Sequence, residues 1–289
     1  MFMLISPAKK LDFSGTLSAR QNPAGIDITS MVTIPEFLNE AAELIRQLRQ
    51  LSASQVAQCM RISDRLAQLN WQRYQDWQIS AHHGAEQPVQ RLPSARPAVF
   101  AFQGDVYQGM HAAQFSAQDL IFAQHHLRIL SGLYGILRPL DLILPYRLEM
   151  GCGFSCHAAK NLYVFWQERL MHDVTRWLQS QYLPEETTEY SGYKKAQPVL
   201  LNLASQEYAR VLDDTQLPGR TITPVFKEYR DGAYKMIGLY AKKARGLMVR
   251  FVVQHRITQV EDIQQFNWAG YAYQEDFSNQ QHWVFTRGD

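Results

Sequence analysis

The sequence is poor in cysteine and in long apolar runs. Its 289 residues include only three cysteines, which excludes the disulfide framework of a small secreted protein and favours a reducing compartment. The run at 98–102 has five apolar residues, and no run approaches the roughly 18 needed to cross a bilayer. We therefore expect a protein without a membrane span.

The chain also lacks an excess of charge of either sign. It has 29 basic and 27 acidic residues, a formal net charge of +2, too little to draw the whole molecule to a polyanion. Any phosphate or nucleic-acid site must therefore be local. The first residues have no basic segment and too short an apolar stretch for a signal peptide, so we expect a cytoplasmic location.

With 46% hydrophobic residues and no visible linker or repeat, residues 1–289 are predicted to form a single compact α+β domain. We expect it to be a monomer with a mixed sheet flanked by helices. Apolar runs and period-2 segments predict strands at 3–5, 98–102, 198–204 and 283–286, and a hairpin at 221–240. Helical periodicity predicts helices beginning near 35 and 63, and helices at 116–130, 161–182 and 241–255.

Polar side chains follow three of the predicted strands. Lys9 comes after the first strand, Asp105 after the second, and Ser205 and Glu207 after the third. Strand ends on a rigid scaffold often carry binding or catalytic groups. We predict that these four side chains face a common cleft.

The strongest signal is a basic helix near the C-terminus. Residues 225–256 contain eight basic and two acidic residues, a local charge of +6. Four of the cations fall on one side of the helical wheel, with the apolar residues on the other. These cations, the predicted DNA contacts of the helix, are Lys242, Lys243, Arg245 and Arg250.

Gly246 falls within the basic arc of this helix. A glycine in mid-helix is costly, and its missing side chain would let a phosphate approach the backbone. The alternative is an ordinary solvated helix face, which accounts for many basic helices.

A second signal lies at 130–151, where Gly132 and Gly135 follow a predicted helix. The spacing is similar to a helix-hairpin-helix, whose turn presents backbone N–H groups to a DNA phosphate. Two residues separate the glycines where the usual hairpin has one, so a helix C-cap with a turn remains open. Lys9 and three arginines in or near this segment complete the predicted DNA contacts. The arginines are Arg128, Arg138 and Arg147.

Other chemistry has little support. Cys152 and Cys156 with His157 lack a second pair of metal ligands, so we predict no metal site. The phosphate-binding loop, the dinucleotide fingerprint and the nucleophile elbow are all missing, so we expect no cofactor.

Taken together, the motifs resemble the YaaA family of bacterial peroxide-stress-resistance proteins. The resemblance runs from end to end of the chain, with two departures: Lys10 replaces a usual threonine, and 152–157 lies in a segment that varies. The segments that carry it are 4–9 (LISPAK), 60–64 (MRISD), 104–107 (GDVY), 130–151, 202–205 (NLAS) with 207–208 (EY), and 240–250 (YAKKARGLMVR).

The resemblance implies a single-domain α+β fold, a positively charged cleft, a helix-hairpin-helix element and binding to double-stranded DNA. It also implies a role in limiting peroxide damage and in keeping unincorporated iron low. Our hypothesis is a DNA-binding stress protein that contacts backbone phosphates and does not read the base sequence. The rival is an enzyme acting on DNA or a nucleotide, with its catalytic groups among Lys9, Asp105, Ser205, Glu207 and Lys243.

Overall fold

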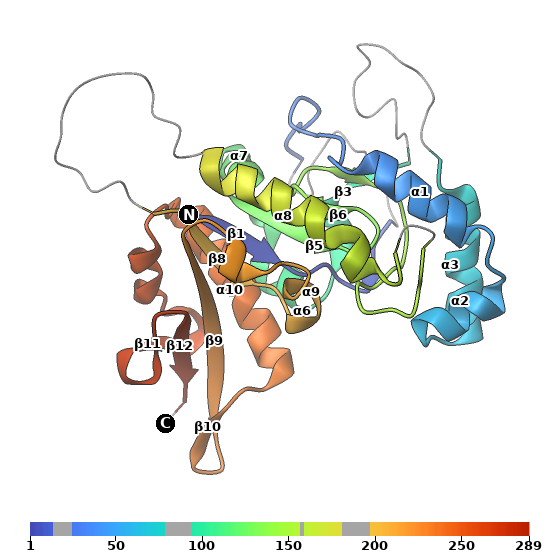
Figure 1. Ribbon diagram of the computed structural model, residues 1–289. Coiled ribbons are helices and arrows are strands. Elements are labelled where there is room, and N and C mark those ends of the chain that lie inside the picture. Colours follow the sequence, from blue (N-terminus) through green and yellow to red (C-terminus); the bar gives the residue numbers. More distant parts are fainter. Residues whose placement is uncertain (14–24, 79–93, 157–158, 181–196, 289) are drawn as a thin grey trace.

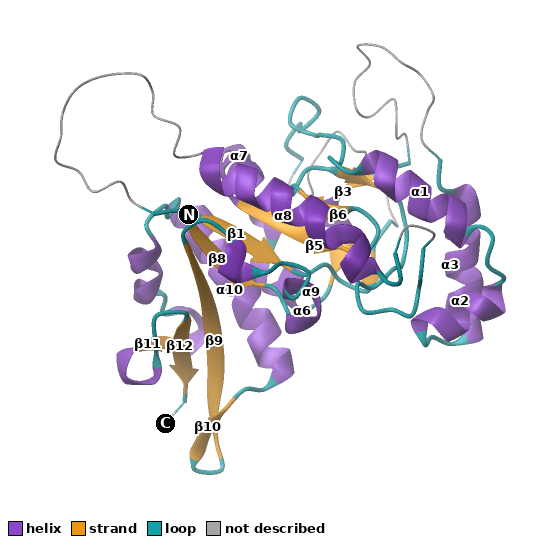
Figure 2. Ribbon diagram, in the orientation of Figure 1, coloured by secondary structure: helices purple, strands orange, loops and turns teal. Residues whose placement is uncertain are grey.

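The computed structural model describes residues 1–13, 25–78, 94–156, 159–180 and 197–288. Its architecture is a mixed sheet flanked by helices, which confirms the predicted α+β class (Figure 2). The helices are α1 Leu38–Leu48, α2 Ala53–Met60, α3 Asp64–Asp76, α5 Ala98–Ala101, α6 Asp105–Met110, α7 Ala117–His126, α8 Leu162–Ser180, α9 Gln206–Ala209 and α10 Gly238–His255. The strands are β1 Phe2–Ile5, β2 Lys10–Leu11, β3 Arg96–Pro97, β4 Phe102–Gln103, β5 Leu127–Ser131, β6 Gly135–Leu137, β7 Leu142–Ile143, β8 Val199–Leu203, β9 Arg220–Arg230, β10 Ala233–Lys235, β11 Ala272–Gln274 and β12 His282–Arg287.

The main sheet has the order β11-β12-β9-β8-β1-β5-β6, with β10 paired to β9. Strand β1 is parallel to both of its neighbours, β5 and β8. All four of its side chains are buried, as expected for a strand covered on both faces. Ile5 is level with Leu203 of β8, so these two strands end side by side.

Helices cover the sheet on both faces. Figure 1 shows α8 lying across β5, with α10 behind β8 and β9. The apolar side of α10 buries Ala244, Met248 and Val252, the residues that the helical wheel assigned to the core. Helices α1, α2 and α3 group at the end of the molecule away from β11 and β12 (Figure 1).

Most predicted elements are confirmed within a few residues, and two are wrong. Residues 98–101 form the short helix α5 rather than a strand, because a brief buried apolar run suits either form. The helix predicted at 116–130 ends at His126, and β5 begins at Leu127. Helix α2 was not predicted, although Ser52 and Gln55 form a capping box at its start.

The predicted helix-hairpin-helix is wrong, because this segment is a β-hairpin. Strands β5 and β6 pair antiparallel, with Ser131 opposite Gly135. The Ser131 hydroxyl accepts the backbone N–H of Tyr134 at 2.9 Å and closes the turn. Gly132 and Gly135 are buried, and Gly135 has a φ of +69°, so glycine is needed here by the turn. Neither backbone is on a surface that DNA reaches.

The prediction for Gly246 is also wrong. The basic-face prediction required Gly246 to be open to solvent, and it is not. It is buried where α10 crosses α6, and a Cβ there would overlap the carbonyl oxygen of Val106. On α6, a Cβ at Gly109 would overlap the carbonyl oxygen of Lys243. The two helices therefore touch backbone to backbone, which only glycine permits.

This crossing predicts a large effect of one methyl group. Gly246→Ala should lower the free energy of unfolding by about 3 kcal/mol, because neither backbone can yield without moving a helix. Gly238→Ala, in the first turn of the same helix, meets nothing within 4 Å and should change it by less than about 1 kcal/mol. Urea unfolding of both variants checks the pair, and equal stabilities would contradict the backbone contact.

Candidate functional site

A cavity of about 330 Å³ lies where β1 and β8 end. We call it the strand-end cavity. Its walls come from the loop after β1, the start of α6, the segment after β8 and the exposed side of α10. The lining residues are Ser6, Pro7, Ala8, Lys9, Lys10, Gln103, Gly104, Asp105, Val106, Tyr107, Leu203, Ser205, Glu207, Tyr208, Lys242 and Arg245.

The structure thus brings together the polar residues predicted at the ends of three apolar segments. Lys9, Asp105, Ser205 and Glu207 all line this one cavity. Parallel pairing of β1 with β8 accounts for Lys9 and the 205–207 pair. Asp105 arrives differently, because β4 pairs with β2 just after Lys9 and α6 starts beside it.

The floor of the cavity is held by hydrogen bonds around Ser6. The Ser6 hydroxyl accepts the backbone N–H of Ser205 at 2.8 Å and donates to the Ser205 hydroxyl at 3.1 Å. The Tyr107 hydroxyl donates to the Ser6 carbonyl at 3.0 Å. Burial raises the pKa of Tyr107 well above its ordinary value, so Tyr107 stays a neutral donor and the loop after β1 is fixed.

Four basic side chains and two carboxylates line the strand-end cavity. Of these, Arg245 is the most informative, because burial lowers the pKa of this half-buried guanidinium. Arginine remains charged in proteins all the same. Within the described residues Arg245 has no hydrogen bond or ion pair. A half-buried cation without a partner favours an anionic group in the cavity.

Glu149 lies beside the cavity and compensates part of its positive charge. Its Oε1 is 2.8 Å from Nη2 of Arg147 and 3.5 Å from Nζ of Lys9. Two residues later, the Gly151 N–H donates to Oε1 of Glu207 at 3.3 Å. Arg147 is therefore next to the cavity, although it is not among the lining residues.

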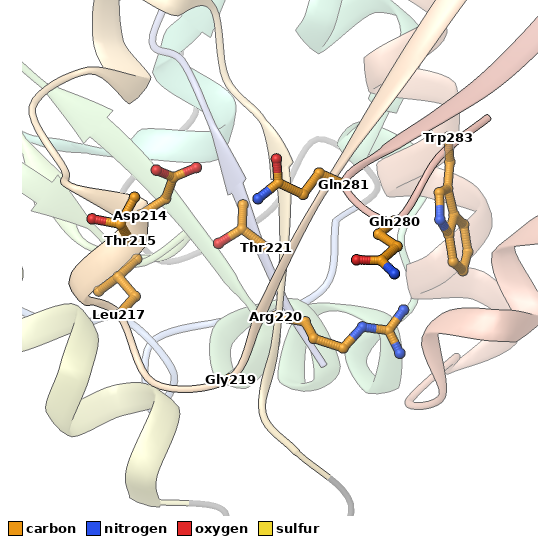
Figure 3. Close-up of a pocket in the computed structure, with 9 residues that line it drawn as sticks. All are labelled: Asp214, Thr215, Leu217, Gly219, Arg220, Thr221, Gln280, Gln281 and Trp283. Carbon is orange, nitrogen blue, oxygen red and sulfur yellow. The ribbon is translucent and has the colours of Figure 1, made fainter. Parts of the chain in front are cut away.

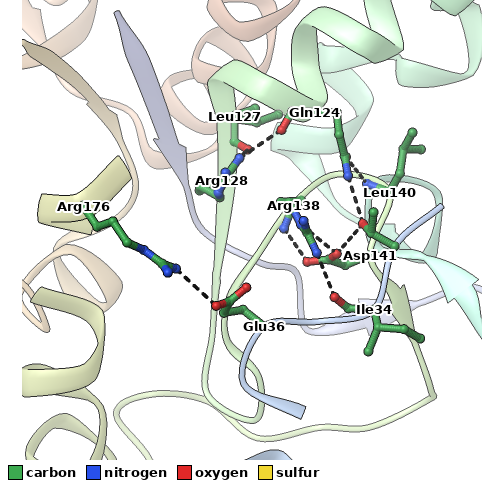
Figure 4. A network of polar contacts seen from close by, with 10 residues as sticks. Ile34, Glu36, Gln124, Leu127, Arg128, Arg138, Leu140, Asp141 and Arg176 are labelled. Atoms are coloured by element: carbon green, nitrogen blue, oxygen red, sulfur yellow. Dashed lines mark hydrogen bonds and ion pairs between the residues drawn. The ribbon is translucent and has the colours of Figure 1, made fainter. Parts of the chain in front are cut away.

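Two of the predicted arginines belong to a different surface (Figure 4). Arg138 pairs with Asp141, Nε to Oδ1, at 3.1 Å. The Arg128 guanidinium lies 4.2 Å from the centre of the Trp177 ring, and burial lowers the pKa of Arg128 to about 10. Arg128 also donates to the carbonyls of Gln124 and Leu127, and Arg138 donates to the carbonyl of Ile34. These contacts give both arginines a structural role, and neither lines the strand-end cavity.

The remaining basic residues of α10 lie outside the cavity lining. Lys243 is exposed. Arg250 donates to the side chains of Gln114 at 3.0 Å and Gln254 at 3.2 Å, and it lies 5.7 Å from the Trp268 ring. The helix therefore points two of its four predicted cations, Lys242 and Arg245, into the cavity.

A larger cavity of about 700 Å³ lies at the start of β9 (Figure 3). It contains none of the predicted site residues. Its one basic side chain, Arg220, is 3.4 Å from Glu261. This cavity is larger than the strand-end cavity, but its described lining residues include only two charged side chains, Asp214 and Arg220. It therefore gives less support for a binding or catalytic site.

Three residues that build the site were missed from the sequence: Ser6, Tyr107 and Glu149. Ser6 and Tyr107 lie in the quoted motifs, and their place next to a strand end and next to Asp105 was a usable signal. Glu149 gave no such signal, because its partner Lys9 is 140 positions away in the sequence. Among the described residues no helix is long and apolar enough to span a membrane, and no group of three or more His, Cys, Asp or Glu residues is arranged to hold a metal.

Comparison with known proteins gives a consistent answer over nearly the whole chain. The family described as peroxide stress protein YaaA matches residues 1–277. The chain belongs to this family. A UPF0246 protein of Cellvibrio japonicus is 46% identical over 99% of this chain and 98% of its own length. UPF0246 proteins of Teredinibacter turnerae, at 42%, and Paraburkholderia xenovorans, at 43%, match over 99% of this chain and 99% and 98% of their own lengths.

Membership of the YaaA family confirms the resemblance that the motifs carried and supports a role in peroxide stress. Several of those motifs supply the strand-end cavity. The segment 4–9 contributes Ser6 and Lys9, 104–107 contributes Asp105 and Tyr107, and 240–250 contributes Arg245 among others.

Glu149 provides a test of the charge balance beside the cavity. Glu149→Gln removes the partner of Arg147, whose side chain is only 16% exposed, and should lower the free energy of unfolding by about 3 kcal/mol. Glu36→Gln is the control, since Glu36 and its partner Arg176 are 50% and 60% exposed and the loss should stay below about 1 kcal/mol. Urea unfolding at neutral pH compares them. Similar losses in both would show that Glu149 compensates no buried charge.

Proposed function

We propose that this protein binds double-stranded DNA without sequence preference and so limits peroxide and iron damage in the cytoplasm. The strand-end cavity receives the backbone phosphate, and Lys9, Lys242 and Arg245 are the contacts. The protein acts as a monomer, and base edges are not read.

The observation that carries this proposal is Arg245, which has no partner among the described residues, in a cavity with three lysines. A phosphate supplies the negative charge that a half-buried guanidinium lacks, and it accepts two of its N–H groups at once. Lys242 is one turn away on the same exposed side of α10. Contacts of this kind fix the position of a duplex but carry no sequence information.

Lys9 is the cation that can be released to a ligand. Its side chain is 67% exposed and its ion pair with Glu149 is 3.5 Å long, so the pair is weak in water. A phosphate that enters the cavity competes with Glu149 for Lys9. Arg147 keeps Glu149 compensated when this happens.

Salt dependence tests the electrostatic part of the proposal. If Lys9, Lys242 and Arg245 neutralise phosphates, the logarithm of the association constant falls against the logarithm of salt concentration with a slope of about −2.7. Arg245→Gln should weaken binding to every duplex and reduce the slope by about 1. Fluorescence anisotropy with labelled duplexes of two unrelated sequences measures both.

Arg220→Gln is the control for this measurement, because Arg220 lies in the larger cavity and bears the same charge. It should leave the slope and the affinity unchanged. A flat salt response of the unmodified protein, or equal effects of the two substitutions, would refute phosphate binding in the strand-end cavity.

A second candidate function is an enzyme acting on DNA or a nucleotide. The carboxylates Asp105 and Glu207 stand in the same cavity as the lysines, and 330 Å³ is within the range of small-molecule sites. A carboxylate acting as base and a lysine forming a Schiff base are the roles available. Lys9, Lys10 and Lys242 line the cavity, whereas Lys243 does not.

Borohydride trapping separates the enzyme from the binding protein. A duplex containing an abasic site is incubated with the protein and reduced, and the mixture is separated under denaturing conditions. The binding proposal expects neither a covalent adduct nor strand cleavage. An adduct that disappears in Lys9→Ala would establish the enzyme instead.

A further inference from the structure

Cys59 and Cys152 lie side by side, although 92 residues separate them in the sequence. Cys59 is near the end of α2, and Cys152 is in the turn after β7. The thiols are near enough that each is the largest influence on the pKa of the other. The backbones are tied as well, because the Gly153 N–H donates to the Cys59 carbonyl at 3.0 Å. A Cβ on Gly153, the residue after Cys152, would lie 4.0 Å from the Cys59 Cα, so the main chains next to the two cysteines are in contact.

Both thiols are half-buried and free, and the third cysteine is not part of the pair. The neighbouring Cys152 thiol lowers the pKa of Cys59, against the opposing effects of burial and of Glu149. The Cys59 thiol and burial raise the pKa of Cys152. Cys59 is thus suited to be the attacking thiolate and Cys152 to be the resolving cysteine. Redox-sensing cysteines often show this arrangement of a thiol with a lowered pKa beside a second thiol.

We propose that Cys59 and Cys152 form a peroxide-reactive dithiol that closes to an intramolecular disulfide. The Cys59 thiolate attacks one oxygen of hydrogen peroxide, the O–O bond breaks, and the departing hydroxide takes up a proton and leaves as water. Cys59 is then a sulfenic acid. The Cys152 sulfur attacks the Cys59 sulfur, the S–O bond breaks, and the hydroxyl leaves as a second water with the proton of Cys152. Two thiols are oxidised and one peroxide is reduced.

A disulfide between Cys59 and Cys152 would change the positions of residues that contact the strand-end cavity. Cys152 closes a turn by donating its N–H to the Glu149 carbonyl at 3.1 Å. The same turn contacts two cavity residues, Lys9 through Glu149 and Glu207 through Gly151. A covalent S–S bond of about 2.05 Å is shorter than any non-bonded contact of two sulfurs, so we expect disulfide formation to shift this turn. An effect on DNA affinity rests on the proposed function, whereas the thiol chemistry does not.

Thiol counting after exposure to peroxide tests the dithiol without reference to DNA. The reduced full-length protein is treated with hydrogen peroxide, quenched with catalase, alkylated and mapped by mass spectrometry without reduction. The expected result is loss of two of the three alkylatable thiols and one cross-linked peptide joining Cys59 to Cys152, both reversed by dithiothreitol. Three free thiols, or a cross-link that includes Cys156, would overturn the proposal.

Single substitutions assign the two roles. In Cys152→Ser the sulfenic acid of Cys59 should persist and be trapped by dimedone, whereas in Cys59→Ser the Cys152 thiol should stay free. Cys156→Ser is the matched control, since the Cys156 thiol is buried and contacts the Ala159 carbonyl at 3.7 Å, and it should oxidise as the unmodified protein does. The cross-linked peptide of the unmodified protein decides the matter if a variant fails to fold.

Anisotropy on the same samples separates the dithiol from the DNA proposal. Oxidation should change duplex affinity several-fold in the unmodified protein and in Cys156→Ser, and leave Cys152→Ser unchanged. A disulfide that forms with no change in measurable DNA affinity would overturn the coupling through the 149–152 turn and leave the dithiol standing. DNA binding by peroxide-treated protein that contains no disulfide would overturn the dithiol and leave the DNA proposal standing.

Discussion

Burial of β1 between two parallel neighbours is the constraint on which the site depends. A short strand with no exposed side chain has no freedom to slip, because a shift of one residue would exchange the side chains between two different faces. Its fixed register with β8 sets the end of one strand beside the end of the other. The chain then leaves the sheet at Ser6 and at Ala204, and both exits open into the same small space. The strand-end cavity is a consequence of this pairing more than of any residue that lines it.

The charges of the cavity are balanced in two different ways. Lys9 has a carboxylate within reach, and that carboxylate has a second and closer cation in Arg147. Arg245 has no such arrangement among the described residues. The cavity therefore combines Lys9, whose weak ion pair can be exchanged, with Arg245, which has no partner among the described residues. This combination suits a site that exchanges an anion with solvent. The acidic groups Asp105 and Glu207 limit how much negative charge can enter.

Much of this site was predictable from the sequence, and the reasons for the failures are physical. Strand ends and a helix with a basic side are local patterns, so Lys9, Ser205 and Lys242 could be assigned to a cleft without knowing the fold. The glycines at 132 and 135 could not be assigned, because a helix C-cap and a hairpin both require glycine at the turn. A helical wheel gave the direction of Gly246 but not what faces it. The contacts of Glu149 and of Cys59 join positions far apart in the sequence, and a single sequence carries no record of them.

The glycine contact between α6 and α10 has a consequence for how accurately the site is built. Helix α6 brings Asp105 to the cavity and α10 brings Lys242 and Arg245, so the separation of acid from base is set by the crossing of two main chains. Side chains at a helix interface can change rotamer and absorb a shift of a few tenths of an ångström, whereas main chains in contact have no rotamers to change. The two helices behave as one rigid body with charges of opposite sign mounted on it. A shift of one helix is therefore expected to carry the other with it, so that the distance between Asp105 and the basic side chains of α10 changes little.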